Sequence, residues 1–161
     1  MSRPAAAVSL RPVTRHNLDA VCALDAGDGG RQVASNQRSL AQAAVHGEAW
    51  PRAIYAGEAA VGFLMLYDPS LLPDPEDPDF ALWRMMIDHR QQGRGYGLAA
   101  LQQLFEHLRT RPHRGELLAS IVEPAPQLVT FYGHAGFVLT DRRVDGERVL
   151  QRSLPPPDRL G

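Results

Sequence analysis

The chain has 161 residues, of which 44% are hydrophobic and 22% are charged, and its formal net charge at pH 7 is -1. Residues 1–161 are therefore expected to form a single domain, with one core over about residues 8–154 and a proline-rich tail over 155–161. The near-neutral charge argues against a nucleic-acid partner, and no stretch approaches the roughly 20 apolar residues that span a membrane.

Strand and helix patterns alternate in the first half of the sequence. A short strand is expected over 8–13, and apolar residues at helical spacing predict a helix over 15–25 that ends at a glycine-rich break. A second helix is expected to begin near Ser35 or Asn36, either of which is a suitable N-cap. Residues 51–56 and 59–67 predict a hairpin, and the segment 68–79, with four prolines and five acids, predicts a loop.

The second half continues the alternation. A strand is expected over 80–88, followed by a glycine stretch and an amphipathic helix that ends at Pro112. A buried strand over 116–122 precedes a short helix over 127–137, where Gly136 is a suitable C-cap. Two strands around Asp145-Gly146, a type I′ turn signal, complete the chain. The fold class is α/β with a mixed sheet.

Cysteine, histidine and the N-terminal stretch restrict the compartment and the metal chemistry. Cys22 is the sole cysteine, which excludes a disulfide within the chain and a cysteine-based zinc site. The six histidines show no ligand spacing, so no metal is expected. The stretch "MSRPAAAVSLRP" lacks the apolar core of a signal peptide. We expect a cytoplasmic protein with no membrane partner.

The stretch "RQQGRGYGLAAL", from Arg90 to Leu101, places three glycines directly before a helix. A glycine within a helix or strand costs about 0.5–1 kcal/mol relative to alanine, so this cluster indicates that something approaches the backbone. Unpaired N–H groups and the positive end of a helix dipole favour phosphate at such a turn. The Gly-Lys-Ser/Thr ending of a P-loop is absent, and the dinucleotide fingerprint has Leu98 where its third glycine belongs.

A third phosphate pattern, Q/R-x-x-G-x-G/A, fits residues 92–97 without a mismatch. Together with "YGHAGF" over 132–137, it resembles the GNAT acyl-CoA N-acyltransferases. Residues 33–43, 53–67 and 84–101 are similar to the bacterial diamine or spermine/spermidine acetyltransferase branch of that family. The resemblance implies a GNAT fold, in which a mixed central sheet splays apart at the cofactor site and carries helices on both faces. It also implies a homodimer as the common assembly.

The resemblance implies acetyl-CoA as the co-substrate and assigns its contacts. The pantetheine arm would run along the strand backbone, the N–H groups of the glycine turn would hold the pyrophosphate, and Gln92 would brace that turn. Plain core packing is the alternative for the two methionines, and a solvated cation is the alternative for Arg94. The residues assigned to the cofactor are Met85, Met86, Ile87, Gln92, Gly93, Arg94, Gly95, Tyr96, Gly97 and Leu98.

Acetyl transfer to an amine requires that the amine lose a proton and that the departing thiolate gain one. Tyr132 stands at the family's Y-x-x-x-G-F position and is the candidate acid, with core packing as its alternative role. Glu123 is the preferred candidate base, ahead of Asp79, while Asp88 is better placed to cap the helix after the glycines. Ala125 stands where the family commonly has an asparagine that contacts the cofactor.

The acceptor is predicted from charge. The loop over 68–79 carries acids and no cation of its own, and Glu76, Asp77 and Asp79 are the candidate substrate-binding residues. Several carboxylates suit a polyamine such as spermidine or spermine, although acidic loops are often simply solvated. Another small amine, such as an antibiotic, an amino acid or a protein N-terminus, is the alternative acceptor. A module that binds acyl-CoA without catalysis is the alternative to an enzyme.

Overall fold

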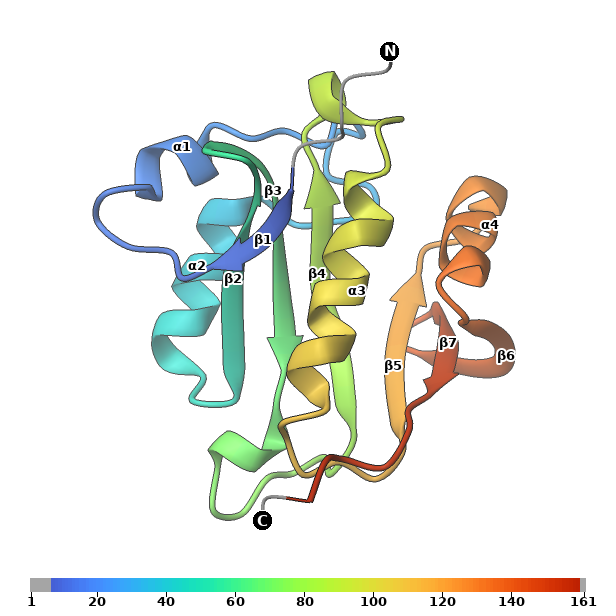
Figure 1. The fold of residues 1–161 in the computed structure, drawn as a ribbon. Coiled ribbons are helices and arrows are strands. Elements are labelled where there is room, and N and C mark those ends of the chain that lie inside the picture. Colours follow the sequence, from blue (N-terminus) through green and yellow to red (C-terminus); the bar gives the residue numbers. More distant parts are fainter. Residues whose placement is uncertain (1–6, 160–161) are drawn as a thin grey trace.

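The computed structural model describes residues 7–159. The first six residues, part of the stretch considered for a signal sequence, and the last two residues of the proline-rich tail lie outside this range. Helices and strands alternate as the sequence predicts (Figure 1). Their bounds are β1 (Val8–Arg11), α1 (Leu18–Cys22), α2 (Asn36–Val45), β2 (Ala49–Ala56), β3 (Ala59–Tyr67), β4 (Phe80–Ile87), α3 (Tyr96–Leu108), β5 (Glu116–Ile121), α4 (Pro126–His134), β6 (Val138–Val144) and β7 (Glu147–Ser153).

Several elements are shorter or less regular than predicted, among them β1, which ends at Arg11, and α4, which ends at His134. The Asn17 side chain accepts from Thr14 N and donates to Pro12 O, so the chain turns here and α1 begins at Leu18. The α3 helix ends at Leu108, because the Thr110 backbone and hydroxyl both bind the carbonyl of His107. The acidic loop contains one 3₁₀ helix, Pro69–Leu71, which the Asp68 side chain caps.

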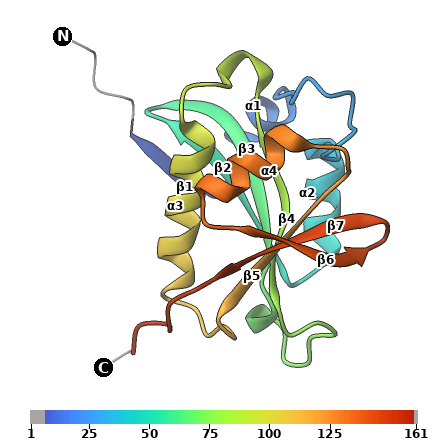
Figure 2. The same cartoon turned by 90° about the vertical axis from the view of Figure 1, so that its right-hand side faces the viewer.

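The strands form one mixed sheet in the order β1-β2-β3-β4-β5-β7-β6. Every neighbouring pair is antiparallel except β4 and β5, which are parallel. Figure 2 shows α3 on one face of the sheet and α1 and α2 on the other, with the β6–β7 turn on the α2 side. The predicted α/β class, with a mixed central sheet and helices on both faces, is therefore confirmed.

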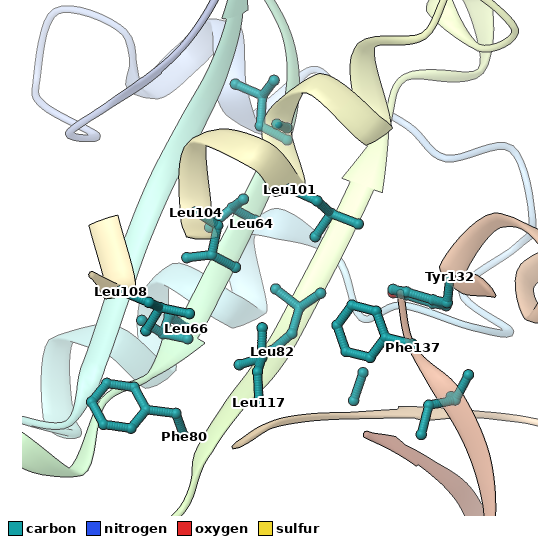
Figure 3. Close-up of a cluster of buried hydrophobic side chains, with 14 of the residues drawn as sticks. Leu64, Leu66, Phe80, Leu82, Leu101, Leu104, Leu108, Leu117, Tyr132 and Phe137 are labelled. Atoms are coloured by element: carbon teal, nitrogen blue, oxygen red, sulfur yellow. The ribbon is translucent and has the colours of Figure 1, made fainter. Parts of the chain in front are cut away.

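Each face of the sheet buries its own apolar cluster. The cluster under α3 and α4 includes Leu64, Leu82, Leu101, Leu104 and Tyr132 (Figure 3). The cluster under α1 and α2 is smaller, and its buried residues are Val21, Ala53, Phe63, Met65 and Met86. Adjacent residues of β4 alternate between the two faces, except at Trp83 and Arg84, as expected for a strand that is covered on both sides.

The sheet splays apart between its two central strands. The pairing of β4 with β5 is limited to Phe80 with Leu117 and Ala81 with Leu118. Immediately beyond, β4 carries a bulge, since Met65 pairs with Arg84 and Leu66 pairs with Leu82, which leaves Trp83 unpaired. A bulge bends a strand and increases its twist. The strands consequently diverge toward their C-terminal ends (Figure 1).

Candidate active site

A cleft of about 510 Å³ opens where β4 and β5 diverge. Its walls are β4 on one side, and the end of β5 together with α4 on the other. The glycine turn and the first turn of α3 close one end, and Gln32 and Val33 of the α1–α2 loop line it as well. The predicted cofactor residues that line this cleft are Met85, Met86, Ile87, Gln92, Gly93, Gly95, Tyr96, Gly97 and Leu98.

The glycine turn has a backbone conformation that other residues rarely adopt. Gly93 and Gly95 have φ angles of +77° and +82°, and a Cβ on either would meet no atom within 4 Å. Gly95 is the N-cap of α3, so free N–H groups of the first helical turn lie next to this open space. The Gln92 amide braces the turn by donating to Ile87 O at 3.0 Å and to Ala26 O at 3.2 Å. The turn therefore presents free N–H groups to open space, an arrangement that favours an anion.

Asp88 holds the start of the glycine turn in place through hydrogen bonds. Its buried carboxylate accepts from the backbone N–H groups of Asp25 and Arg90, each at 3.0 Å, and from Arg90 Nε at 2.9 Å. The hydrogen bond from the Arg90 guanidinium is the main reason why the pKa of Asp88 lies well below its usual range. Asp88 caps the 3₁₀ helix His89–Gln91 rather than α3, which corrects the cap predicted from the sequence. It also ties the end of α1 to the glycine turn.

Gly97 brings α3 and α4 close together. A Cβ at this position would lie 2.9 Å from Cε2 of Phe131, so no larger residue fits without a shift. The contact positions the helix that carries Tyr132 against the first turn of α3. The two motifs, residues 92–97 and 132–137, are far apart in the sequence and are thus brought together at the cleft.

Tyr132 lines the cleft from α4 and is 8% exposed. Its ring makes edge contacts with Phe131, at a centroid distance of 5.1 Å, and with Phe137, at 5.2 Å. Figure 3 shows the second of these pairs. Burial raises the pKa of Tyr132 to about 12. The phenol is therefore protonated at every physiological pH, which is the state that an acid requires.

The other predicted site residues lie outside the cleft lining. Arg94 is exposed on the glycine turn. Glu123 is held by Arg143 Nη2 at 2.9 Å and Arg148 Nη1 at 3.5 Å, on the β6–β7 hairpin. Ala125, in the asparagine position, is the N-cap of α4 and makes no side-chain cap.

The acidic loop lies at the N-terminal end of β4, the end away from the glycine turn (Figure 1). Glu76 and Asp77 are exposed, Asp79 is half-buried, and Asp77 Oδ1 accepts from Asp79 N at 2.9 Å. Asp68 is fully buried and pairs with Arg111 Nε at 3.2 Å. The expectation that no cation compensates this loop is therefore wrong for Asp68, because its partner comes from the segment after α3.

Several polar residues of the cleft were not predicted from the sequence. Arg84 lines it from β4 and Asp28 from the α1–α2 loop. Gln32, also from that loop, exchanges hydrogen bonds with the backbone of Val122, donating to its carbonyl at 2.6 Å and accepting from its N–H at 3.0 Å. An arginine inside the apolar strand "FALWRMMI" was the available signal for the first of these. The loop contacts had no local signal.

The described residues also bear on membranes and metals. Within residues 7–159, no helix combines the length and apolar character that a bilayer span requires. Over the same residues, no group of three or more acidic, histidine or cysteine side chains is arranged to hold a metal ion.

Comparison with known proteins agrees with the geometry. The sequence model of the Acetyltransferase (GNAT) family matches residues 24–137. Comparison with curated proteins gives no match. An acetyltransferase from Thermus thermophilus shares 22% identity and a TM-score of 0.69, over 91% of this chain and 97% of that one.

Two other similar structures are of acetyltransferases with different acceptors. A chimera of the spermidine N-acetyltransferase SpeG from Vibrio cholerae and hSSAT has a TM-score of 0.68 and 13% identity, over 92% of this chain and 96% of that one. A ribosomal-protein alanine N-acetyltransferase from Escherichia coli has a TM-score of 0.65 and 15% identity, over 96% of each chain. The family model spans most of the chain, and the members of its family use acetyl-CoA. The chain therefore belongs to the GNAT acetyltransferase family and is an acyl-CoA N-acyltransferase.

Proposed function

We propose that this chain, as a single domain, binds acetyl-CoA in the cleft between β4 and β5 and transfers its acetyl group to a primary amine. The observation that carries the proposal is the cleft itself. It joins an open glycine turn at the N-terminus of α3 to the buried Tyr132 on the wall formed by β5 and α4. One site thereby combines backbone N–H groups that can bind an anion with a protonated phenol that can act as an acid.

The cofactor contacts follow from unpaired backbone. Beyond Ala81, the edge of β4 that faces β5 has no strand partner among the described residues, so Met85 to Ile87 can pair with the amides of the pantetheine arm. The N–H groups from Gly93 to Leu98 hold the pyrophosphate. Arg94, which is exposed beside this turn, adds a screened attraction.

The chemistry is a direct attack. The neutral amine forms a bond to the thioester carbonyl carbon, which gives a tetrahedral intermediate with a protonated nitrogen. The intermediate breaks its carbon–sulfur bond as Tyr132 donates its proton to the departing thiolate, and the proton that the nitrogen loses passes through water to restore the Tyr132 phenol. A phenol with a pKa of about 12 is a weak acid toward a thiol whose ordinary pKa is about 8.5. The desolvation that raises the phenol pKa also raises the proton affinity of the thiolate, which brings the two closer together.

An amine that arrives as an ammonium ion must lose a proton before it can attack, and this proton needs a separate acceptor. Glu123, acting through water, remains the candidate, but Arg143 and Arg148 already bind its carboxylate. Asp28 is the carboxylate that lines the cleft, and its oxygens accept from the backbone N–H groups of Gly30 and Gln32. An amine that reaches the site already neutral therefore suits this cleft best.

Two acceptor classes have support. A polyamine is favoured by the exposed acids of the loop and by the likeness to the spermidine acetyltransferase chimera. Because that loop lies at the far end of β4, a polyamine would have to extend along the strand from the cleft to reach it. An amine that carries an anionic group is favoured by Arg84, which lies in the cleft itself.

Release of free thiol from acetyl-CoA, measured with a panel of amines, tests the proposal. We expect release with at least one primary amine, and Tyr132→Phe should lower turnover by roughly 10²–10⁴-fold, the usual effect of losing a positioned acid. Binding of acetyl-CoA should survive in this variant, because the glycine turn is intact. Binding of acetyl-CoA without turnover of any amine would instead indicate a non-catalytic module.

A further inference from the structure

Arg84 owes its position to the bulge in β4. In a regular strand, Trp83 and Arg84 would point to opposite faces of the sheet. Because the bulge leaves Trp83 without a partner on β3, both side chains lie on the α2 face. Trp83 packs against the α1–α2 cluster, and Arg84 Nη2 donates to Oε1 of Gln42 on α2 at 3.1 Å. Arg84 lines the cleft from this face.

Neutral groups hold the guanidinium in place. Besides the bond to Gln42, Nη1 donates to the carbonyl of Trp83 at 3.0 Å, and the guanidinium carbon lies 5.7 Å from the centroid of the Trp83 ring. Within residues 7–159, the Nε atom is shielded from solvent and finds no hydrogen-bond acceptor. The side chain is thus oriented, but its charge is not neutralised by these contacts.

The electrostatic surroundings of Arg84 also leave the cation uncompensated. Burial is the main cause that lowers its pKa, and the nearby Arg38 lowers it further. Glu147 acts in the opposite direction, but none of the ion pairs within 4.0 Å among the described residues involves Arg84. Arg111, which is also half-buried, pairs with Asp68 instead. A half-buried cation without a counter-charge is costly, so an anion in the cleft would relieve a cost that the free protein bears.

We propose that Arg84 binds a carboxylate of the acceptor, so that the preferred substrate is an amine that also carries a carboxylate, such as an amino acid. This inference rests on the proposed acetyl transfer in the same cleft. A guanidinium binds a carboxylate through charge-assisted hydrogen bonds, and its planar donors set the orientation of the bound group. A polyamine lacks such a group and would be repelled by the same cation.

Pairs of acceptors that differ in charge alone test the inference. Free-thiol release is measured with α-amino acids and with ω-amino acids of increasing length, each beside its own carboxamide, and with spermidine. The wild-type protein should use the best carboxylate at least about tenfold more efficiently than its carboxamide, as expected when a desolvated charge loses its partner. The length of the best substrate measures the span from the amine site to Arg84.

Variants then assign the preference to Arg84. Arg84→Gln should raise KM for the best carboxylate by about 10- to 100-fold and leave KM for its carboxamide within about threefold. Arg84→Lys keeps the charge but loses the planar fork and should fall in between. Arg52→Gln is the matched control, because Arg52 is also half-buried and also binds the preceding carbonyl, at 2.7 Å, but stacks on Trp50 outside the cleft lining.

The outcomes separate this inference from the proposed function. Equal use of carboxylate and carboxamide, or spermidine as the best acceptor, would overturn the carboxylate site and leave acetyl transfer intact. The carboxylate site is also overturned if Arg84→Gln affects both members of a pair alike while acetyl-CoA still protects the variant against thermal unfolding. No thiol release with any amine, from a protein that binds acetyl-CoA, would overturn the proposed function itself.

Discussion

Tyr132 links the chemistry of the cleft to the stability of the fold. Its pKa is about 12 in the folded chain against 10.0 for an unperturbed tyrosine, because burial disfavours the phenolate. Below pH 10 the group is neutral in both states and has no effect on the pH dependence of stability. As the pH rises from 10 to 12, the unfolded chain loses this proton while the folded chain retains it, so the free energy of unfolding falls.

The magnitude follows from the shift. Two pKa units correspond to about 3 kcal/mol of lost stability once the pH exceeds 12, of which about 1.4 kcal/mol is already lost at pH 11. Tyr132→Phe keeps the ring packed on its aromatic neighbours but cannot ionise. The free energy of unfolding of the wild type minus that of the variant should therefore fall by about 1.4 kcal/mol between pH 8 and pH 11.

Urea unfolding of both proteins at pH 8, 9, 10 and 11 measures this difference, with the slope m checked for constancy. The measurement at pH 8 is the internal control, because it gives the packing cost of removing the hydroxyl without any ionisation. If this difference between the free energies of unfolding stays constant within about 0.5 kcal/mol up to pH 11, the reasoning is refuted. The phenol would then be solvated, and Tyr132 would not be the buried acid of this site.

Three further predictions concern the glycine turn, the half-buried His107 and the buried Asp68. Gly95→Val places a β-branched residue at a φ of +82° and should abolish protection by acetyl-CoA against thermal unfolding; full protection would contradict the pyrophosphate assignment. Burial lowers the pKa of His107, so stability should fall as the pH drops below 6.5, and His107→Phe should flatten that loss in acid unfolding curves. Asp68→Asn leaves Arg111 without its counter-charge and should cost about 1–3 kcal/mol in urea unfolding. Glu106→Gln, at an exposed pair, should stay within about 0.5 kcal/mol, and equal losses would contradict the weight given to burial.

Local patterns predicted most of the elements, because their causes lie within a few residues. Ser35 caps α2 with its side chain, as its position before the apolar spacing predicts. Asp145 and Gly146 both have positive φ angles, of 52° and 81°, as a type I′ turn requires. The start of α1 and the end of α3 were predicted wrongly, because side-chain hydrogen bonds of Asn17 and Thr110 replace helical turns that the apolar pattern alone would continue.

The sequence by itself determined the family and the composition of the glycine turn. Residues 92–97 and 132–137 carry that information locally, since a glycine turn needs a particular backbone conformation whatever surrounds it. Tertiary structure decided which charges face the cleft. Asp68 and Glu123 form ion pairs with arginines that are distant in sequence, whereas the bulge at Trp83 turns Arg84 into the site. Pairing between distant side chains and a one-residue slip in strand register leave no local pattern, so both appear only when the chain is folded.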